Sequence, residues 1–170
     1  MLFRSVLIAG GYADAVSSTA ELYDPKTGTF TKTGDLSTPR CKHTAAALPD
    51  GRVLVAGGSN ERGWNGNLSS AEIFDPRTGK FTTAAAMHDS RFKLPDEAVR
   101  VASGQLLIAG GSKQVEIFDP ATGQFSVAAG RLNEAWHFMT ETKLREGSVL
   151  LAGGYPNDPS ATAQAWIYRP

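Results

Sequence analysis

The segment "AEIFDPRTGKF" at residues 71–81 decides the fold, because the chain contains close copies of it at residues 20–30 and 115–125. The copies read "AELYDPKTGTF" and "VEIFDPATGQF". Each reads as a strand, a turn and the start of a second strand. In the turn, proline presets one backbone angle and glycine accepts a left-handed one, so the chain reverses within a few residues. The recurrence predicts a series of similar β-hairpins.

A second motif recurs out of phase with the hairpin. It is an apolar run that ends in two glycines, at residues 6–11, 53–58, 106–111 and 149–154, which gives a period of about 45 to 50 residues, in the range of propeller blades. Consecutive apolar residues predict a strand covered on both faces. We expect the glycines to be structural, because a residue without a side chain lets the backbone approach a neighbouring strand closely. They are Gly10, Gly11, Gly57, Gly58, Gly110, Gly111, Gly153 and Gly154.

Each full period reads as a meander of four short strands, which we name a to d. In the second period these are residues 43–48, 53–58, 71–75 and 80–85. Threonine, valine, isoleucine and phenylalanine crowd the periodic segments, and glycine or proline interrupts them too often for an amphipathic helix of normal length. The sequence therefore predicts an all-β fold.

These motifs together resemble kelch repeats, in the variety found in many bacterial proteins and in the central domain of galactose oxidase. The resemblance rests on the double glycine, on an aromatic residue 7 to 16 positions later, and on the D-P-x-T-G-x-F turn. It implies a β-propeller in which strand a lies innermost, around a channel. The family pattern usually places an arginine before strand a; this chain has Arg40 and Arg91 there, but Trp136 at the third such position. The later aromatic residues are Tyr23, Phe74, Phe118 and Tyr168.

The number of strands predicts an incomplete ring. The chain starts at strand b, supplies two complete blades, and stops after strand c, so the blade pieces fall at about 1–35, 36–86, 87–131 and 132–170. Closed propellers have about four to eight blades. We therefore expect one domain over residues 1–170, a kelch-type propeller segment of about three and a half four-stranded antiparallel blades, belonging to a longer propeller. Association of chains through open blade edges is the alternative.

Composition excludes several classes of function. The 17 lysines and arginines balance the 17 aspartates and glutamates, so the chain lacks the general charge that binding to nucleic acid or acidic membranes requires. Cys41 is the single cysteine, which excludes an intrachain disulfide and a C-x-x-C pair. The apolar run near the N-terminus is too short to span a membrane and lacks a signal-type cleavage region. The sequence predicts no compartment.

The connections between strands predict which face binds a ligand. In a meander, the a–b and c–d connections lie on one face of the disc, and the b–c and d–a connections lie on the other. The b–c connections vary widely, from "SKQ" at residues 112–114 to "SNERGWNGNLSS" at residues 59–70. Rigid scaffolds carry their function on variable loops, so we expect the b–c and d–a face to bind.

The longest b–c connection carries the first candidate binding residues, Arg62, Trp64 and Asn65. Tryptophan and arginine are frequent anchors at binding interfaces, and an exposed tryptophan can also stack on a sugar. The alternative is that Trp64 folds over the blade as part of an ordinary turn.

The residues before strand a are the second candidate group: Arg40, Arg91 and Trp136. Guanidinium groups at the mouth of a channel would suit the carboxylates of an acidic peptide. The alternative is that the arginines pair with the recurrent Glu21, Glu72 and Glu116 and hold the blades together.

No catalytic constellation is recognisable. Galactose oxidase binds copper through tyrosines and histidines, with a cysteine crosslinked to a tyrosine, but His43, His88 and His137 form no close pair and no tyrosine near Cys41 matches that pattern. Neither G-x-S-x-G nor H-E-x-x-H is present. We therefore predict a non-catalytic scaffold without cofactor or metal, binding a protein, a peptide or a glycan. The alternative is an accessory part of a secreted enzyme that resembles galactose oxidase.

Overall fold

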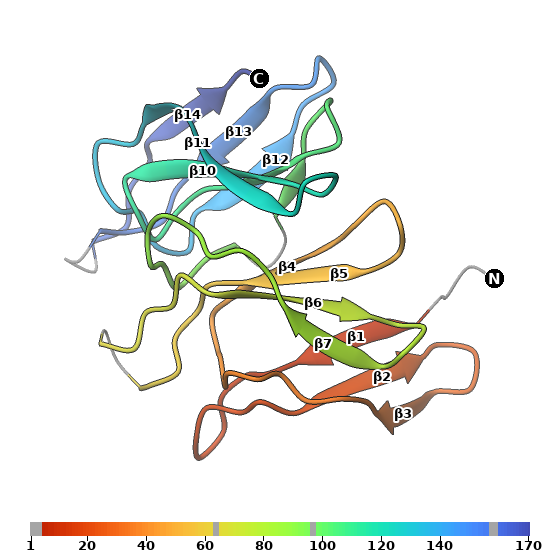
Figure 1. Cartoon of the computed structure of the whole chain (residues 1–170). Coiled ribbons are helices and arrows are strands. Elements are labelled where there is room, and N and C mark those ends of the chain that lie inside the picture. Colours follow the sequence, from red (N-terminus) through yellow and green to blue (C-terminus); the bar gives the residue numbers. More distant parts are fainter. Residues whose placement is uncertain (1–4, 63–64, 96–97, 157–159) are drawn as a thin grey trace.

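The computed structural model describes residues 5–62, 65–95, 98–156 and 160–170. This part of the chain contains fourteen β-strands in four antiparallel sheets and no helix (Figure 1). Blade 1 comprises β1 (Val6–Ala9), β2 (Ala20–Asp24) and β3 (Thr29–Lys32). Blade 2 comprises β4 (Thr44–Ala47), β5 (Val53–Ala56), β6 (Ala71–Asp75) and β7 (Lys80–Thr83). Blade 3 comprises β8 (Val99–Arg100), β9 (Leu106–Ile108), β10 (Gln114–Asp119) and β11 (Gln124–Arg131). Blade 4 comprises β12 (Thr140–Lys143), β13 (Val149–Ala152) and β14 (Ala165–Tyr168).

Every blade is a meander in which strands adjacent in sequence are hydrogen-bonded neighbours. Blades 2 and 3 have four strands, whereas blade 1 begins at the b position and blade 4 ends at the c position. The prediction of an all-β, incomplete kelch-type propeller is therefore confirmed. No helix in the described residues is long and apolar enough to cross a membrane.

The strand register makes positions comparable between blades. Val53 on strand b pairs with Phe74 on strand c in blade 2, as Leu106 pairs with Phe118 in blade 3. The c-strand aromatic residue then packs against the phenylalanine that follows the D-P-x-T-G turn, with ring centroids 4.8 to 4.9 Å apart in blades 1 to 3. The hairpin that recurs in the sequence thus forms the same aromatic contact between strands c and d in each of these blades.

The apolar core lies between the blades. Leu54 and Ala56 of blade 2 belong to one buried cluster with Leu106, Ile108 and Phe118 of blade 3. A second cluster joins the opposite side of blade 3 to blade 4. Because both faces of β5 and β9 are covered, their apolar residues are consecutive instead of alternating.

The innermost strand of blade 3 is shorter than its counterparts. β8 has two residues, whereas β4 and β12 have four. The amide of Ala109, directly after β9, donates a hydrogen bond of 2.8 Å to the Glu141 carboxylate from β12. A side chain of blade 4 thus binds the end of strand b in blade 3.

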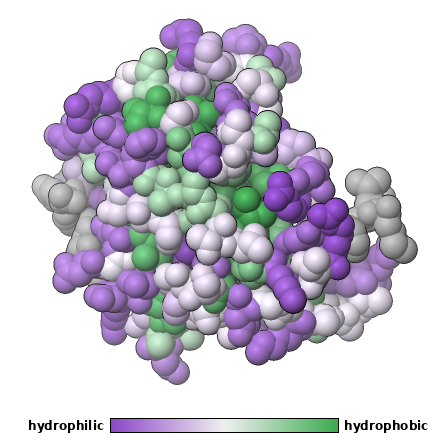
Figure 2. Space-filling view, viewed as in Figure 1, coloured by the Kyte–Doolittle hydropathy of each residue, from purple (hydrophilic) through white to green (hydrophobic). Residues whose placement is uncertain are grey.

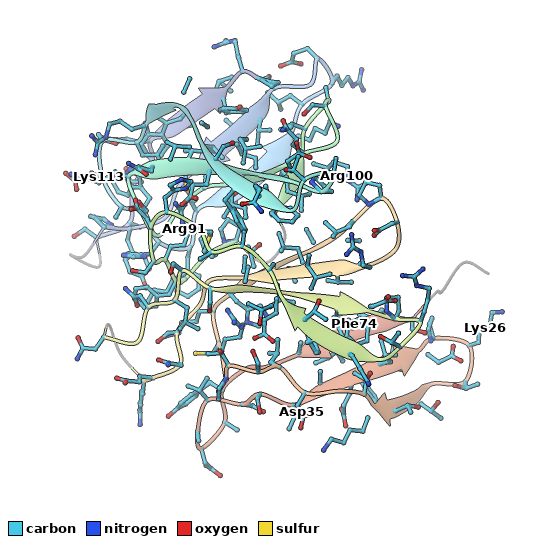
Figure 3. The ribbon with its side chains drawn as sticks, viewed as in Figure 1. Lys26, Asp35, Phe74, Arg91, Arg100 and Lys113 are labelled. Atoms are coloured by element: carbon cyan, nitrogen blue, oxygen red, sulfur yellow. The ribbon has the colours of Figure 1, made fainter. Side chains whose placement is uncertain are left out.

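The turns and loops separate onto two sides of the molecule. In Figure 1 the c–d turns lie at the right, and the b–c loops lie at the left. Figure 2 shows hydrophilic residues over much of the outline, with hydrophobic residues in small groups between them. Lys113 of the blade 3 b–c loop and Lys26 of the blade 1 c–d turn mark the two opposite sides in Figure 3. The strand order therefore gives the loop geometry expected from a meander.

Candidate functional site

The double glycines join each blade to the loop that enters the next blade. The Gly11 amide donates to the carbonyl of Arg40, and the Gly58 amide donates to the carbonyl of Arg91, both at 2.9 Å. Gly58 has a φ of 90°, and a Cβ on it would lie 2.5 Å from the Cys41 carbonyl oxygen. A side chain would therefore push the d–a loop away from the end of strand b.

The d–a loop of blade 2 is held by a buried ion pair between Arg40 and Glu72. The Arg40 side chain has no exposed surface, and its guanidinium donates to the Glu72 carboxylate at 2.9 Å and to the carbonyls of Gly57 and Ser70 at 2.8 and 3.1 Å. Burial by itself raises the pKa of Glu72, but hydrogen bonds from Ser37 and Arg40 outweigh it and lower that pKa below its ordinary value. Glu72 is therefore the anionic partner of Arg40.

Blade 3 repeats this arrangement. The Arg91 guanidinium, labelled in Figure 3, lies 2.6 Å from the Glu116 carboxylate and also donates to the carbonyls of Ile108, Gly110 and Gln114. Both side chains have 0% of their surface exposed. Burial lowers the pKa of Arg91, and the charge of Glu116 opposes this effect.

These contacts correct the expectation that Arg40 and Arg91 face the channel mouth to bind carboxylates of a ligand. Their guanidinium groups are bound to carboxylates of the same blade and to backbone carbonyls. Arg40 and Arg91 therefore fix the loops in place, and we do not include them in the ligand surface.

Trp136 is also buried, and we do not include it in the ligand surface. It is 5% exposed and packs against Trp166 on β14, with ring centroids 5.4 Å apart. The register places Trp166 opposite Leu151, as Glu72 lies opposite Val55. Blade 4 therefore has a tryptophan pair where blades 2 and 3 have an arginine and a glutamate. The Trp136 indole N–H donates to the Asn133 side chain at 3.1 Å.

A pocket opens on the loop side between blades 1 and 2. Its volume is about 310 Å³, and its lining comes from both b–c loops and from the d–a loop that separates them. The Arg62 guanidinium lies 5.9 Å from the centre of the Tyr12 ring, within the range of a cation–π contact. The pocket thus places an aromatic ring and cations at one site. Its lining residues are Gly11, Tyr12, Cys41, Lys42, Glu61 and Arg62.

A row of lysines and aromatic rings continues from this pocket towards blade 4. Lys93 is 8% exposed, and its ammonium lies 5.2 Å from the centre of the Phe92 ring and 5.0 Å from that of Tyr155. Lys42 approaches the same Phe92 ring at 5.9 Å. Lys42, Lys93 and Phe138 occupy the same place in three blades, each with φ between 52° and 54°.

The sequence analysis did not identify this row. The one signal for it is a fixed offset, because Lys42, Lys93 and Phe138 each follow the Arg or Trp before strand a by two positions. The contacts between the lysines and the aromatic rings join residues of different blades, so no local sequence pattern predicts them.

The remaining candidates lie on the blade 2 b–c loop. Arg62 and Asn65 are exposed there. Trp64 lies outside the described residues. Of the predicted binding residues that the structure describes, Arg62 alone lines the pocket.

The three histidines do not come together. His43 is half-buried beside Gly58, and burial, assisted by the charge of Arg40, lowers its pKa to about 4. His88 binds Glu116 through Nδ1 at 2.9 Å, and His137 packs against Phe92. Within the described ranges, no three histidine, cysteine, aspartate or glutamate side chains gather as potential metal ligands.

Comparison with known proteins agrees with this repeat architecture. The family model of the kelch motif matches residues 40–88, which contain the whole of blade 2 and the last four residues of the loop that enters it. The chain carries kelch repeats. One relative of this kelch chain is the Kelch-like ECH-associated protein 1A of Danio rerio, which is 30% identical over 108 residues. The match covers 63% of the present chain and 17% of that relative, so the kelch chain spans a small part of the relative's length.

Proposed function

We propose that this kelch chain is a non-catalytic scaffold that binds a protein or peptide partner on its b–c and d–a face. The observation that carries the proposal is the pocket of about 310 Å³ between the loops of blades 1 and 2. The b–c loops of two neighbouring sheets meet there, and loops held by a sheet scaffold are where such proteins carry binding residues. Similarity to a protein named as ECH-associated supports a protein partner.

The chemistry of the pocket favours an acidic segment that also carries an apolar side chain. Lys42 and Arg62 are exposed cations at its rim, against the single carboxylate of Glu61. The ring of Tyr12, 46% exposed, offers an apolar surface beside them. An aliphatic side chain of the partner would contact this ring while its carboxylates bind Lys42 and Arg62.

The buried ion pairs support this role indirectly. Arg40 ties its own loop to Gly57, Ser70 and Glu72, and that loop carries Lys42 into the pocket. A preorganised loop loses less conformational freedom on binding, which increases affinity.

Two arginines of blade 2 give a matched test. Arg62 lies in the b–c loop at the pocket, whereas Arg77 lies in the c–d turn on the opposite side and is 73% exposed. The probe is a fluorescent octapeptide with one leucine between two pairs of glutamates, measured by anisotropy. We expect binding that Arg62→Ala weakens by about ten-fold, as for an interface anchor, and that Arg77→Ala leaves unchanged. Equal losses in both variants, or no binding, would reject the proposed face.

A glycan is the second candidate ligand, because the exposed Tyr12 ring could stack on a sugar. The same assay with a galactose-containing oligosaccharide as competitor separates the two classes. Displacement of the peptide by the oligosaccharide would favour the glycan.

A further inference from the structure

The lining of the pocket between blades 1 and 2 includes one carboxylate, Glu61, whose backbone is held by its neighbours. The Glu61 amide donates to the Ser59 hydroxyl at 3.2 Å, and that hydroxyl donates to the Glu61 carbonyl at 2.8 Å. A Cβ on Gly66 would lie 2.8 Å from the Cβ of Glu61, so Gly66 packs directly against it. Contacts on two sides therefore fix the point from which the Glu61 side chain extends.

Ser59 also ties Glu61 to the d–a loop that lines the same pocket. The Ser59 amide donates to the carbonyl of Cys41, and the Cys41 amide donates to the carbonyl of Ser59, both at 2.9 Å. Cys41 and the next residue, Lys42, belong to the lining. The anion of Glu61 and the cation of Lys42 thus stand on two backbone segments that are joined by hydrogen bonds.

Neither cation of the pocket neutralises the Glu61 carboxylate. Arg62, the next residue in the chain, places its guanidinium 5.9 Å from the centre of the Tyr12 ring in blade 1. The Glu61 side chain is exposed and has no hydrogen-bond or ion-pair partner among the residues that the structure describes. The pocket therefore presents charges of both signs that are not paired with each other.

The turns on the opposite side of blade 2 behave differently. Asp50 of the a–b turn binds Arg52 at 2.7 Å. Asp75 of the c–d turn binds Arg77, also at 2.7 Å. In both turns the chain supplies the cation for its own carboxylate, which it does not do for Glu61.

The b–c loop of blade 3 also pairs its own charge. Ser112 follows the double glycine there as Ser59 does in blade 2, and its hydroxyl likewise accepts from the amide two positions later, at 3.1 Å. Lys113 then lies 3.2 Å from Glu134 of the loop that enters blade 4. The two b–c loops begin alike, but the blade 2 loop leaves a carboxylate without a cation.

A purely acidic ligand would meet this carboxylate in the bound state. Its own carboxylates would bind Lys42 and Arg62, but they would share a pocket of about 310 Å³ with Glu61. Like charges brought together in an interface oppose binding and suppress wrong partners. A charge that only the correct partner can pair is a common basis of specificity.

We propose that Glu61 selects partners whose acidic segment also carries a lysine or an arginine, which binds the Glu61 carboxylate while the acidic residues bind Lys42 and Arg62. This inference rests on the proposed function, because it concerns the same pocket. The partner segment then combines acidic residues, an apolar side chain for the Tyr12 ring, and one basic residue.

A preference for a basic residue would report contact with Glu61 and not a general attraction. The formal net charge of the whole chain is zero, so the chain as a whole does not favour a less acidic peptide. The two cations of the pocket lining, Lys42 and Arg62, oppose the approach of a lysine. At 0.15 M salt, charges more than about 8 Å away are largely screened.

The test extends the anisotropy assay to matched pairs of peptides. Each pair is the acidic octapeptide with either lysine or glutamine at one of its three positions outside the leucine and the glutamates. We expect the lysine peptide of at least one pair to bind about three- to five-fold more tightly than its glutamine counterpart, the upper range for an ion pair that solvent reaches. Glu61→Gln should abolish that preference and tighten the binding of the glutamine peptides, because it removes a like charge from the pocket.

Glu134→Gln is the matched control variant. Glu134 is also an exposed carboxylate in a loop, but it is paired with Lys113 and does not belong to the pocket lining. This substitution should leave the preference for the lysine peptide unchanged.

Two results would overturn this inference alone. One is equal binding of lysine and glutamine peptides in every pair, with binding that Arg62→Ala still weakens; the pocket would then bind acidic segments without selection by Glu61. The other is a preference for lysine that Glu61→Gln leaves intact. Absence of binding by all peptides would overturn the proposed function together with this inference, so the two failures are distinguishable.

Discussion

Raising the pH from 6.5 to 8 should destabilise the fold through one carboxyl group, Glu141. This side chain reaches from β12 to the amide of Ala109 in blade 3, and its second oxygen is buried without a hydrogen-bond partner in the described structure. Burial raises the pKa of Glu141 to about 8, against smaller opposing effects of amide hydrogen bonds and of the Arg91 charge. Ionisation of Glu141 is therefore unfavourable in the folded chain.

The sign and size of the effect follow from proton linkage. Between the ordinary value of 4.5 and about 8, the folded state holds a proton on Glu141 that the unfolded state has lost. The free energy of unfolding then falls as pH rises, by about 1.4 kcal/mol per pH unit. From pH 6.5 to 8 the loss is about 2 kcal/mol, which lowers the melting temperature by roughly 4 to 8 °C for a chain of this size.

Thermal melts of three proteins at both pH values test this reasoning. Glu141→Gln keeps an amide oxygen for Ala109 and removes the charge, so it should abolish most of the pH dependence and be more stable than the original chain at pH 8. Glu134→Gln removes an exposed carboxylate and should keep the dependence. A Glu141→Gln protein with the same pH dependence as the original chain would refute the argument.

Three further predictions concern stability. Arg40→Met should lower the free energy of unfolding, measured in urea, by about 3 to 5 kcal/mol, because it leaves the Glu72 carboxylate buried without its cation. Adding Glu72→Leu should recover part of that loss. A double variant no more stable than Arg40→Met would contradict this. Gly58→Ala should lower the melting temperature more than Gly51→Ala. The two glycines have similar φ values of 90° and 88°, but a Cβ at Gly58 would lie 2.5 Å from the Cys41 carbonyl oxygen, whereas a Cβ at Gly51 meets nothing within 4 Å. Equal melting temperatures of the two variants would contradict this. Because the pKa of His43 is lowered to about 4, stability should fall as pH drops from 6.5 towards 4, and His43→Leu should reduce that fall in acid unfolding curves.

The strands and the blades could be predicted from the sequence because their signals are local and repeated. The apolar run before each double glycine and the D-P-x-T-G turn fix the strands b, c and d within about 30 residues of chain. The order of strands then determines which connections share a side of the molecule. The pocket between the loops of blades 1 and 2 uses that side, although its lining could not be predicted.

The roles of individual side chains could not be decided in the same way. From the sequence, Arg40 could bind either a ligand or a buried carboxylate. The pairing of β5 with β6 places Glu72, which is 32 positions away in the sequence, next to Arg40, and this contact decides its role. Glu141 gave no signal, because its partner, the Ala109 amide, lies in another blade and 32 positions away in the sequence. The ammonium of Lys93 lies over the ring of Tyr155, which belongs to another blade and is distant in the sequence.

Hydrogen–deuterium exchange of the chain with and without the acidic octapeptide tests the central claim most directly. The account predicts slower exchange, on peptide binding, for the loop amides that line the pocket, namely Gly11, Tyr12, Cys41, Lys42, Glu61 and Arg62. The c–d turns around Thr27, Thr78 and Thr122, on the opposite side, should exchange at unchanged rates. Protection confined to those turns, with none at the pocket, would contradict the assignment of the b–c and d–a face as the binding surface.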